Sequence, residues 1–196
     1  MIIETIISSI NDDGKVNFAP IGIYVPDNTQ KLLDVKEMEI FLYPGSKTFN
    51  NLKATKIGVV NFTDDILSFV DTALFSFILP SLPSHMVLSP RMADANMIWE
   101  FMVTFFDDST EPARVKCKIL CAKEYAGFTG FCRAHCVILE AIIAATRLQF
   151  ISATRIEKSW PLWQEVVNRT GGLREFQAFS KVTDYFIQNG IVLPIN

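Results

Sequence analysis

The sequence predicts an α+β fold in which an antiparallel sheet or barrel comes first and helices follow. Up to about residue 128, short runs rich in β-branched and aromatic residues alternate with turn signals. Beyond that point, apolar residues recur at helical spacing. Of the 196 residues, 49% are apolar and 20% are charged, so the chain is long and apolar enough to bury a substantial core.

The expected strands are bounded by turn-forming residues. The first two are joined by "NDDG", in which Gly14 supplies the positive φ of a hairpin turn. Pro20, within the second run, cannot donate a ladder hydrogen bond, so it marks a sheet edge, a bulge or a distortion beside a ligand. Gly22 permits close backbone approach. The six expected strands are 2–10, 15–25, 35–43, 57–62, 97–106 and 113–125.

Two helices are expected among the strands and three after them. The first two are 46–55 and 63–77, and the last three are 131–150, 155–170 and 173–189. Gly171 is expected to end a helix with a positive φ. The segment "LPSLPSHMVLSPRMADA", with three prolines, predicts a surface loop that crosses the barrel and covers a pocket. We therefore divide the chain into a barrel, 1–128, and a helical subdomain packed on it, 129–196.

Charge and hydropathy exclude two classes of partner. The net charge is −3, with acidic and basic residues mixed, so no basic stripe is available for nucleic acid. The longest apolar stretches, such as "VILEAIIAATRL", carry charges, so no membrane span is expected. The start of the chain lacks the basic region of a signal peptide, and the expected location is the cytoplasm.

Four cysteines fall in two C-x3-C pairs, Cys117 with Cys121 and Cys132 with Cys136, and His135 lies inside the second pair. Thiolates and imidazole are zinc ligands, and the second pair would share one face of a helix. The first pair lies in an expected strand without a turn between its members. We therefore interpret the cysteines as small apolar residues and predict no metal site.

The stretch "YPGSKTFNNLK" follows an apolar run and resembles half of a phosphate-binding loop. It lacks the spacing G-x-x-x-x-G-K-[ST], which excludes a P-loop nucleoside triphosphatase. Ser46, Lys47 and Thr48 nevertheless precede a short helix, where hydroxyl groups, an ammonium and free backbone N–H groups favour a phosphate. A plain helix cap, with Lys47 in solvent, explains the same string. The motif alone leaves both interpretations open.

The order of motifs is more informative than any one of them. "DGKVNFAPIG", then "GSKTFNNL", then "GVVNFTDD" resembles the order in flavin mononucleotide (FMN) binding split barrels, including flavin reductase-like and pyridoxamine-phosphate-oxidase-like proteins. The resemblance implies an antiparallel Greek-key split β-barrel. It also assigns Asn17, Ala19, Pro20, Ile21 and Gly22 to the flavin, Ser46, Lys47, Thr48 and Asn51 to the phosphate, and Asn61 to the ribityl region.

A closer resemblance covers nearly the whole chain. Together with these motifs, "FCRAHCVILEAIIAATRL" and "TGGLREFQAF" look like an archaeal and bacterial family of FMN-binding split barrels known as a domain of unknown function. Members tend to carry Arg where Lys47 stands and Asn where Cys132 stands. The resemblance implies a homodimer that holds FMN non-covalently at its interface and exchanges electrons with a small-molecule donor or acceptor. The alternative is a carrier or sensor of flavin or of another phosphorylated ligand, without turnover.

The remaining polar residues give no catalytic motif. Arg133, Glu140 and Arg147 share nearly one face of an expected helix, where we favour buried ion pairs over contact of Arg133 with the cofactor. His85 lies in the proline-rich loop, from which it can reach substrate if that loop covers the flavin. Asp64 and Asp65 are expected to cap the following helix. Catalytic residues stay unassigned, and the chemistry must come from a cofactor.

Overall fold

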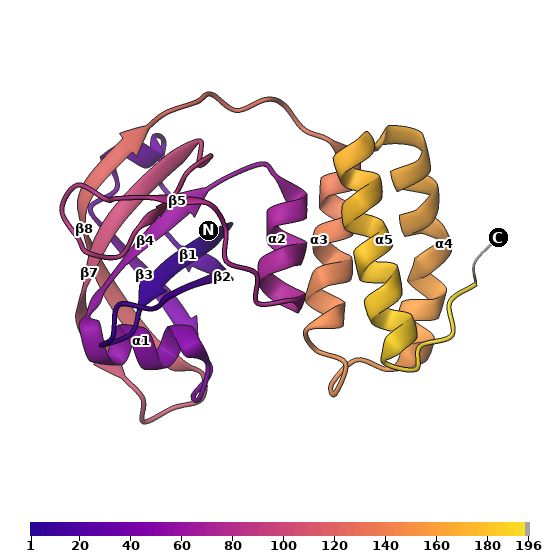
Figure 1. Cartoon of the computed structure of the whole chain (residues 1–196), viewed down its shortest axis with the longest axis horizontal. Coiled ribbons are helices and arrows are strands. Elements are labelled where there is room, and N and C mark those ends of the chain that lie inside the picture. The colour runs from indigo at the N-terminus through magenta and orange to yellow at the C-terminus, as the bar shows by residue number, and fades with distance from the viewer. Residues whose placement is uncertain (195–196) are drawn as a thin grey trace. The chain divides into compact units, whose positions relative to one another are not determined.

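The computed structural model describes residues 1–194 and divides the chain into two compact units (Figure 1). The first unit, Met1–Thr63 with Ser76–Phe128, is a closed antiparallel barrel with the strand order β1-β2-β3-β8-β7-β4. This confirms the prediction of an α+β fold that begins with the strands. The barrel strands are β1 (Ile2–Ile10), β2 (Val16–Tyr24), β3 (Glu37–Leu42), β4 (Ile57–Phe62), β7 (Met97–Asp107) and β8 (Ala113–Glu124).

Alternation of side chains along the strands builds the barrel core. Gly14, with φ at +78°, makes the predicted hairpin turn between β1 and β2. The inward-facing side chains include fully buried Ile7, Val60 and Trp99. Helix α1 (Lys47–Thr55) adds Phe49 and Leu52 to the same core.

Among residues 1–194, one edge of β2 finds no strand partner over most of its length. β2 pairs with β1 throughout, but with β3 only at Ile23 and Tyr24. Met1 and Val25 exchange both of their backbone hydrogen bonds, at 3.1 and 3.0 Å. Because such pairs alternate along an antiparallel ladder, the odd-numbered residues of β2 bond to β1. The even-numbered residues from 16 to 22 therefore direct their backbone polar groups toward the unpaired edge.

The segment between Ser76 and Asn96 covers the outer face of β1, β4 and β7. It contains the short strands β5 (Ser81–Leu82) and β6 (Arg91–Met92), which pair with each other. The Ser8 hydroxyl donates to the Pro90 carbonyl at 2.6 Å, which ties the segment to β1. The proline-rich loop thus crosses the barrel as predicted, although its two short strands were not predicted.

The second unit is a group of four helices drawn from two parts of the chain. It comprises Asp64–Phe75 and the described residues from Thr129 onward. Its helices are α2 (Ile66–Leu74), α3 (Arg133–Ala145), α4 (Ala153–Thr170) and α5 (Leu173–Gln188). Because α2 packs against α3 and α5, it groups with the later helices, whereas the division at residue 128 assigned it to the barrel segment (Figure 1).

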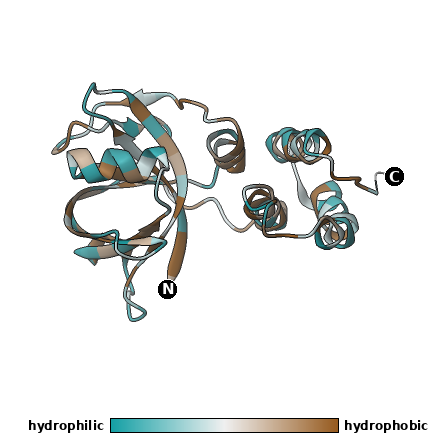
Figure 2. Cartoon of the chain, turned by 90° about the horizontal axis from the view of Figure 1, so that it is seen from below, coloured by the Kyte–Doolittle hydropathy of each residue, from teal (hydrophilic) through white to brown (hydrophobic). Residues whose placement is uncertain are grey.

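Aromatic packing forms the centre of the helical unit. Hydrophobic and hydrophilic residues are interspersed along its helices (Figure 2). In α5 the buried residues recur at helical spacing and form one apolar face, Ala178, Phe179, Val182 and Phe186. Trp160 of α4 stacks on Phe179 of α5, with ring centroids 4.7 Å apart, and meets Phe186 edge-on at 5.9 Å. Offset and edge-on ring pairs of this kind add to the stabilisation from buried area.

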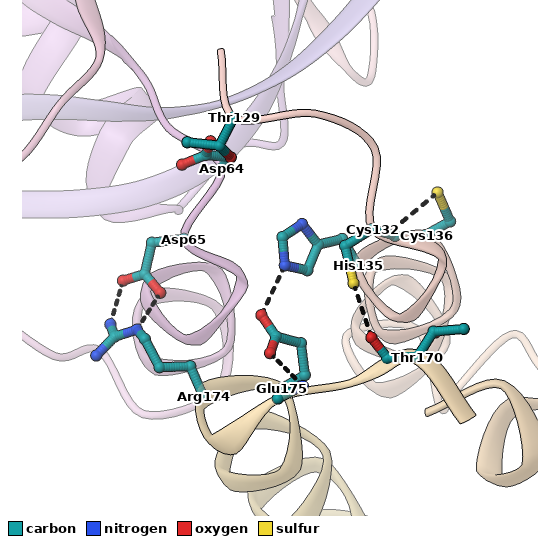
Figure 3. Close-up of polar contacts among 10 residues, drawn as sticks. Asp64, Asp65, Thr129, Cys132, His135, Cys136, Thr170, Arg174 and Glu175 are labelled. Carbon is teal, nitrogen blue, oxygen red and sulfur yellow. Dashed lines mark hydrogen bonds and ion pairs between the residues drawn. The ribbon is translucent and has the colours of Figure 1, made fainter. Parts of the chain in front are cut away.

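Polar contacts connect the ends of these helices (Figure 3). Asp65, at the N-cap of α2, accepts a hydrogen bond from Nε of Arg174 on α5 at 2.8 Å. The carboxylate of Glu175 accepts from the Gly172 backbone N–H at 2.8 Å and contacts Nε2 of His135 on α3 at 2.7 Å. The three helices are thereby fixed to one another at one end of the unit.

Two expectations for the helices were wrong. Gly171 has φ at −81°, so it does not need a left-handed conformation. A Cβ atom there would lie 2.8 Å from the Val167 carbonyl oxygen, so glycine serves close approach instead. Arg133, Glu140 and Arg147 are exposed and form no ion pair within residues 1–194, so they are not the expected buried pairs.

None of the helices in the described part of the chain has the length and apolar character needed to cross a membrane.

Lowering the pH should destabilise the helical unit through Asp65. Burial raises the pKa of Asp65, but hydrogen bonds from Arg174 and Ser68 outweigh burial and hold the pKa below its ordinary value of 3.8. A carboxyl with a depressed folded pKa contributes stability above its unfolded pKa and loses it as the pH falls through the folded value. We expect Asp65→Asn to lower the melting temperature at neutral pH and to weaken its decline below about pH 4.

Circular dichroism melts across this pH range test the prediction. The matched control is Asp184→Asn, because Asp184 is exposed on α5. An Asp65→Asn protein with the wild-type pH profile would contradict the role given to this carboxylate.

Candidate functional site

The N-terminal end of α1 is the most exposed part of the predicted phosphate loop. Ser46 is the N-cap, and its hydroxyl oxygen accepts from the Phe49 N–H at 3.2 Å. Lys47 is exposed and forms no ion pair within residues 1–194. Over the same residues, the backbone N–H groups of Lys47 and Thr48 make no hydrogen bond. At the positive end of the helix dipole, the Lys47 ammonium thus faces solvent, beside two backbone N–H groups that have no partner in residues 1–194.

Thr48 and Asn51 point from the same helix into the barrel. Thr48 is buried, and its Oγ1 accepts from Nδ2 of Asn17 on β2 at 3.2 Å. Asn51 is also buried and donates to the Ser9 hydroxyl on β1 at 3.0 Å. These two hydrogen bonds hold α1 against the first two strands. The structure therefore brings Asn17 and Thr48 together, and it places the phosphate loop beside the start of the unpaired β2 edge.

The five predicted flavin contacts on β2 divide between the two edges of the strand, according to the direction of their backbone polar groups. Ala19 and Ile21 bond to β1 through their backbones, and Ile21 packs against the barrel core. Pro20 and Gly22 have their backbone polar groups on the unpaired edge. Pro20 therefore costs the β1–β2 ladder no hydrogen bond. Of the three explanations for this proline, which were a sheet edge, a bulge and a distortion beside a ligand, the structure supports the sheet edge. What this edge offers is backbone: the N–H groups of Phe18 and Gly22 and the carbonyl between them at Pro20.

Asn61 has a different place in the structure. Its side chain is fully buried on β4, where Nδ2 donates to the Ile6 carbonyl at 3.0 Å and to the Ser8 hydroxyl at 3.1 Å. Its Oδ1 accepts from the Met92 N–H at 2.7 Å. Both ends of the amide are engaged within the chain, and they anchor the covering segment. The contact with a ribityl chain stays a prediction.

Glu100 is a structural anchor that the sequence reasoning missed. Its side chain on β7 is fully buried, and its carboxylate accepts from three successive backbone N–H groups of the covering segment. The distances are 2.7 Å from His85 and 3.1 Å from Val87. A single acid within the apolar run "IWEFMVTF" was the available signal. Because a buried carboxylate needs donors, it indicated a polar partner lying over this strand.

The cysteines and His135 are not arranged as a metal site. Burial raises the pKa of Cys117 to about 12, which keeps it a neutral thiol. Cys132 directs its sulfur to the Thr170 carbonyl at 3.4 Å, while His135 is engaged with Glu175 (Figure 3). Among the described residues, no three His, Cys, Asp or Glu side chains come together in a way that could hold a metal ion.

A closed antiparallel barrel with a helix across one end and an unpaired stretch along one strand is a split barrel, the class of fold that the motifs predicted. Residues 3–126 match the family model described as the N-terminal domain of a protein of unknown function, DUF447. The chain belongs to this family. A comparison with curated proteins finds no match.

Solved structures share the fold. An FMN-bound DUF447 protein of Methanosarcina mazei is 21% identical, covers 94% of this chain and 94% of its own, and has a TM-score of 0.79. A 2-nitrobenzoate 2-nitroreductase of Pseudomonas fluorescens is 20% identical over 62% of this chain and 64% of its own, with a TM-score of 0.51. An FMN-binding protein of Thermus thermophilus with bound 1-cyclohex-2-enone is 11% identical over 62% and 70%, with a TM-score of 0.52.

Replacing Glu100 by glutamine should loosen the covering segment. Glutamine keeps one acceptor oxygen but turns an N–H₂ group toward backbone donors, and hydrogen bonds to the charged acceptor are lost. We expect the free energy of unfolding to fall by roughly 2 kcal/mol. The backbone amides of His85, Met86 and Val87 should also exchange with solvent faster.

Urea denaturation and amide hydrogen exchange measure these two effects. Glu124→Gln is the matched control, because Glu124 is exposed on the neighbouring strand β8. Unchanged protection of the three amides in Glu100→Gln would show that the carboxylate does not hold the segment.

Proposed function

We propose that this protein binds FMN non-covalently along the unpaired edge of β2, with the FMN phosphate at the N-terminal end of α1. The observation that carries the proposal is the hydrogen bond between Asn17 and Thr48, which joins these two features. From Phe18 to Gly22 the edge extends about 13 Å at the usual rise of a strand. One elongated ligand can therefore contact both.

The two features offer complementary chemistry to the two ends of FMN. At α1, the Lys47 ammonium and two free N–H groups suit a phosphate. Along β2, alternating backbone donors and acceptors suit the amide-like groups of the flavin ring, while Pro20 presents an apolar surface without an N–H group. The membership of the chain in DUF447 and the fold it shares with an FMN-bound member support the same assignment.

Part of the site would come from a second copy of the chain. The side chains of Tyr24 and Tyr43 are 40% and 58% exposed, and they lie at the end of β2 and just before the phosphate loop. Exposed aromatic groups beside an open strand edge favour a protein partner. We therefore place the flavin at a homodimer interface.

FMN supplies electron transfer when bound, and this chain's residues would hold and orient it. Of the proposed contact residues, only Lys47 carries a titratable side chain, so the protein contributes binding and shielding rather than an acid or base. An FMN-dependent oxidoreductase that works with a small-molecule donor or acceptor is the function that this arrangement supports best.

Removal of the Lys47 ammonium should weaken FMN binding. The purified protein should be yellow, and Lys47→Ala should raise the dissociation constant for FMN about tenfold, because a charge-assisted contact to phosphate is lost. Quenching of flavin fluorescence measures the constant. Lys53→Ala is the control on the same helix, since the Lys53 ammonium pairs with Asp108 at 2.6 Å. A colourless protein that takes up no added FMN would exclude the proposal.

Turnover separates an enzyme from a carrier. We expect the bound flavin to be bleached by NADH or NADPH, because an FMN-dependent oxidoreductase must accept electrons from a small-molecule donor. Stopped-flow absorbance in the flavin bands gives the rate. Slow reduction by every nicotinamide donor, with FMN still tightly bound, would favour the carrier or sensor.

A further inference from the structure

Three basic side chains gather around one tyrosine on the outer face of the barrel. Nε2 of His85 lies 3.0 Å from the hydroxyl of Tyr125, and the guanidinium carbon of Arg91 lies 4.2 Å from the centroid of its ring. The ammonium of Lys123 is 5.3 Å from the same centroid. His85 and Arg91 come from the covering segment, and Lys123 and Tyr125 lie at the end of β8 and just beyond it. We call these four residues the Tyr125 cluster.

The guanidinium of Arg91 is fixed with its donor edge free. Nη1 donates to the carbonyls of Met92 and Ala93, each at 3.2 Å. Within residues 1–194, Nε and Nη2 make no hydrogen bond. These two atoms form the edge through which an arginine binds an oxyanion with two parallel hydrogen bonds. Stacking on Tyr125 holds the side chain in place.

The positive charge of the cluster is not balanced at the surface. None of the three basic side chains forms an ion pair with a described carboxylate. The Glu100 carboxylate lies beneath the covering segment, but it is fully buried and its oxygens accept from the backbone of residues 85–87. Like charges brought together repel, so the cluster is a site that an anion would stabilise.

We propose that the Tyr125 cluster binds the phosphate group of a phosphorylated small molecule. Arg91 and Lys123 together carry two positive charges, which match a phosphate monoester dianion better than a carboxylate. The hydroxyl of Tyr125 and the ring of His85 add polar groups that can exchange hydrogen bonds with phosphate oxygens. This site does not depend on FMN binding, because none of its residues belongs to the α1 phosphate loop or to the β2 edge.

A titration with inorganic phosphate, at constant ionic strength and followed by amide NMR, tests the proposal. Phosphate should shift the signals of residues 85–91 and 123–125. Arg91→Gln and Lys123→Gln should each weaken binding about tenfold, the effect of losing a charged hydrogen-bond donor. Lys123→Gln removes no contact to the backbone, so it tests the site even if Arg91→Gln disturbs the segment. Lys118→Gln, an exposed change roughly 16 Å earlier on β8, should have no effect.

Two results would overturn the proposal. Equal, weak phosphate binding in all these variants would mean nonspecific attraction. Shifts confined to residues 46–49 and lost in Lys47→Gln would place the anion at α1 instead. Flavin absorbance of the same samples reports on FMN separately, so failure of one site is distinguishable from failure of the other. Adenosine 2′-monophosphate and glycerol 3-phosphate, titrated in turn, distinguish a nucleotide from a smaller phosphorylated ligand.

Discussion

The structure depends on a strand that pairs fully on one side and only briefly on the other. β2 follows β1 along its entire length, yet it meets β3 only at Ile23 and Tyr24. Unpaired backbone groups on a sheet edge need water, a ligand or another chain. At one end of this edge, α1 is attached to β2 by the hydrogen bond from Asn17 to Thr48. The remainder of the edge is the surface to which we assign the cofactor.

The outer face of the barrel is organised by buried polar side chains rather than by apolar packing alone. Ser8, Asn61 and Glu100 project outward from β1, β4 and β7, and each bonds to the backbone of the covering segment. A segment rich in proline cannot satisfy its backbone groups by pairing along its length, so side chains of the barrel supply the partners. The same anchoring fixes the positions of His85 and Arg91, which makes the Tyr125 cluster possible.

The sequence predicted local structure where the signal was local. The hairpin at Gly14, the strand runs and the helix after Ser46 all follow from turn residues, periodicity and capping, and the structure contains them. Predictions from the sequence failed where a residue's conformation or burial depended on contacts that form only in the folded chain. Gly171 carries no signal for the Val167 carbonyl that crowds it, and a charged stripe such as Arg133 with Glu140 looks the same whether it meets solvent or a partner.

The candidate site shows the same division. The order of its motifs resembles that of FMN-binding split barrels, and this resemblance, rather than any single motif, predicted the fold and selected Asn17, Lys47 and Thr48 as candidate contacts. Only the tertiary structure decided that Thr48 and Asn51 face inward, that Asn61 and Glu100 anchor a loop, and that residues 85, 91, 123 and 125 meet. Strand register and loop closure set those contacts, and both arise from pairings between segments far apart in the chain.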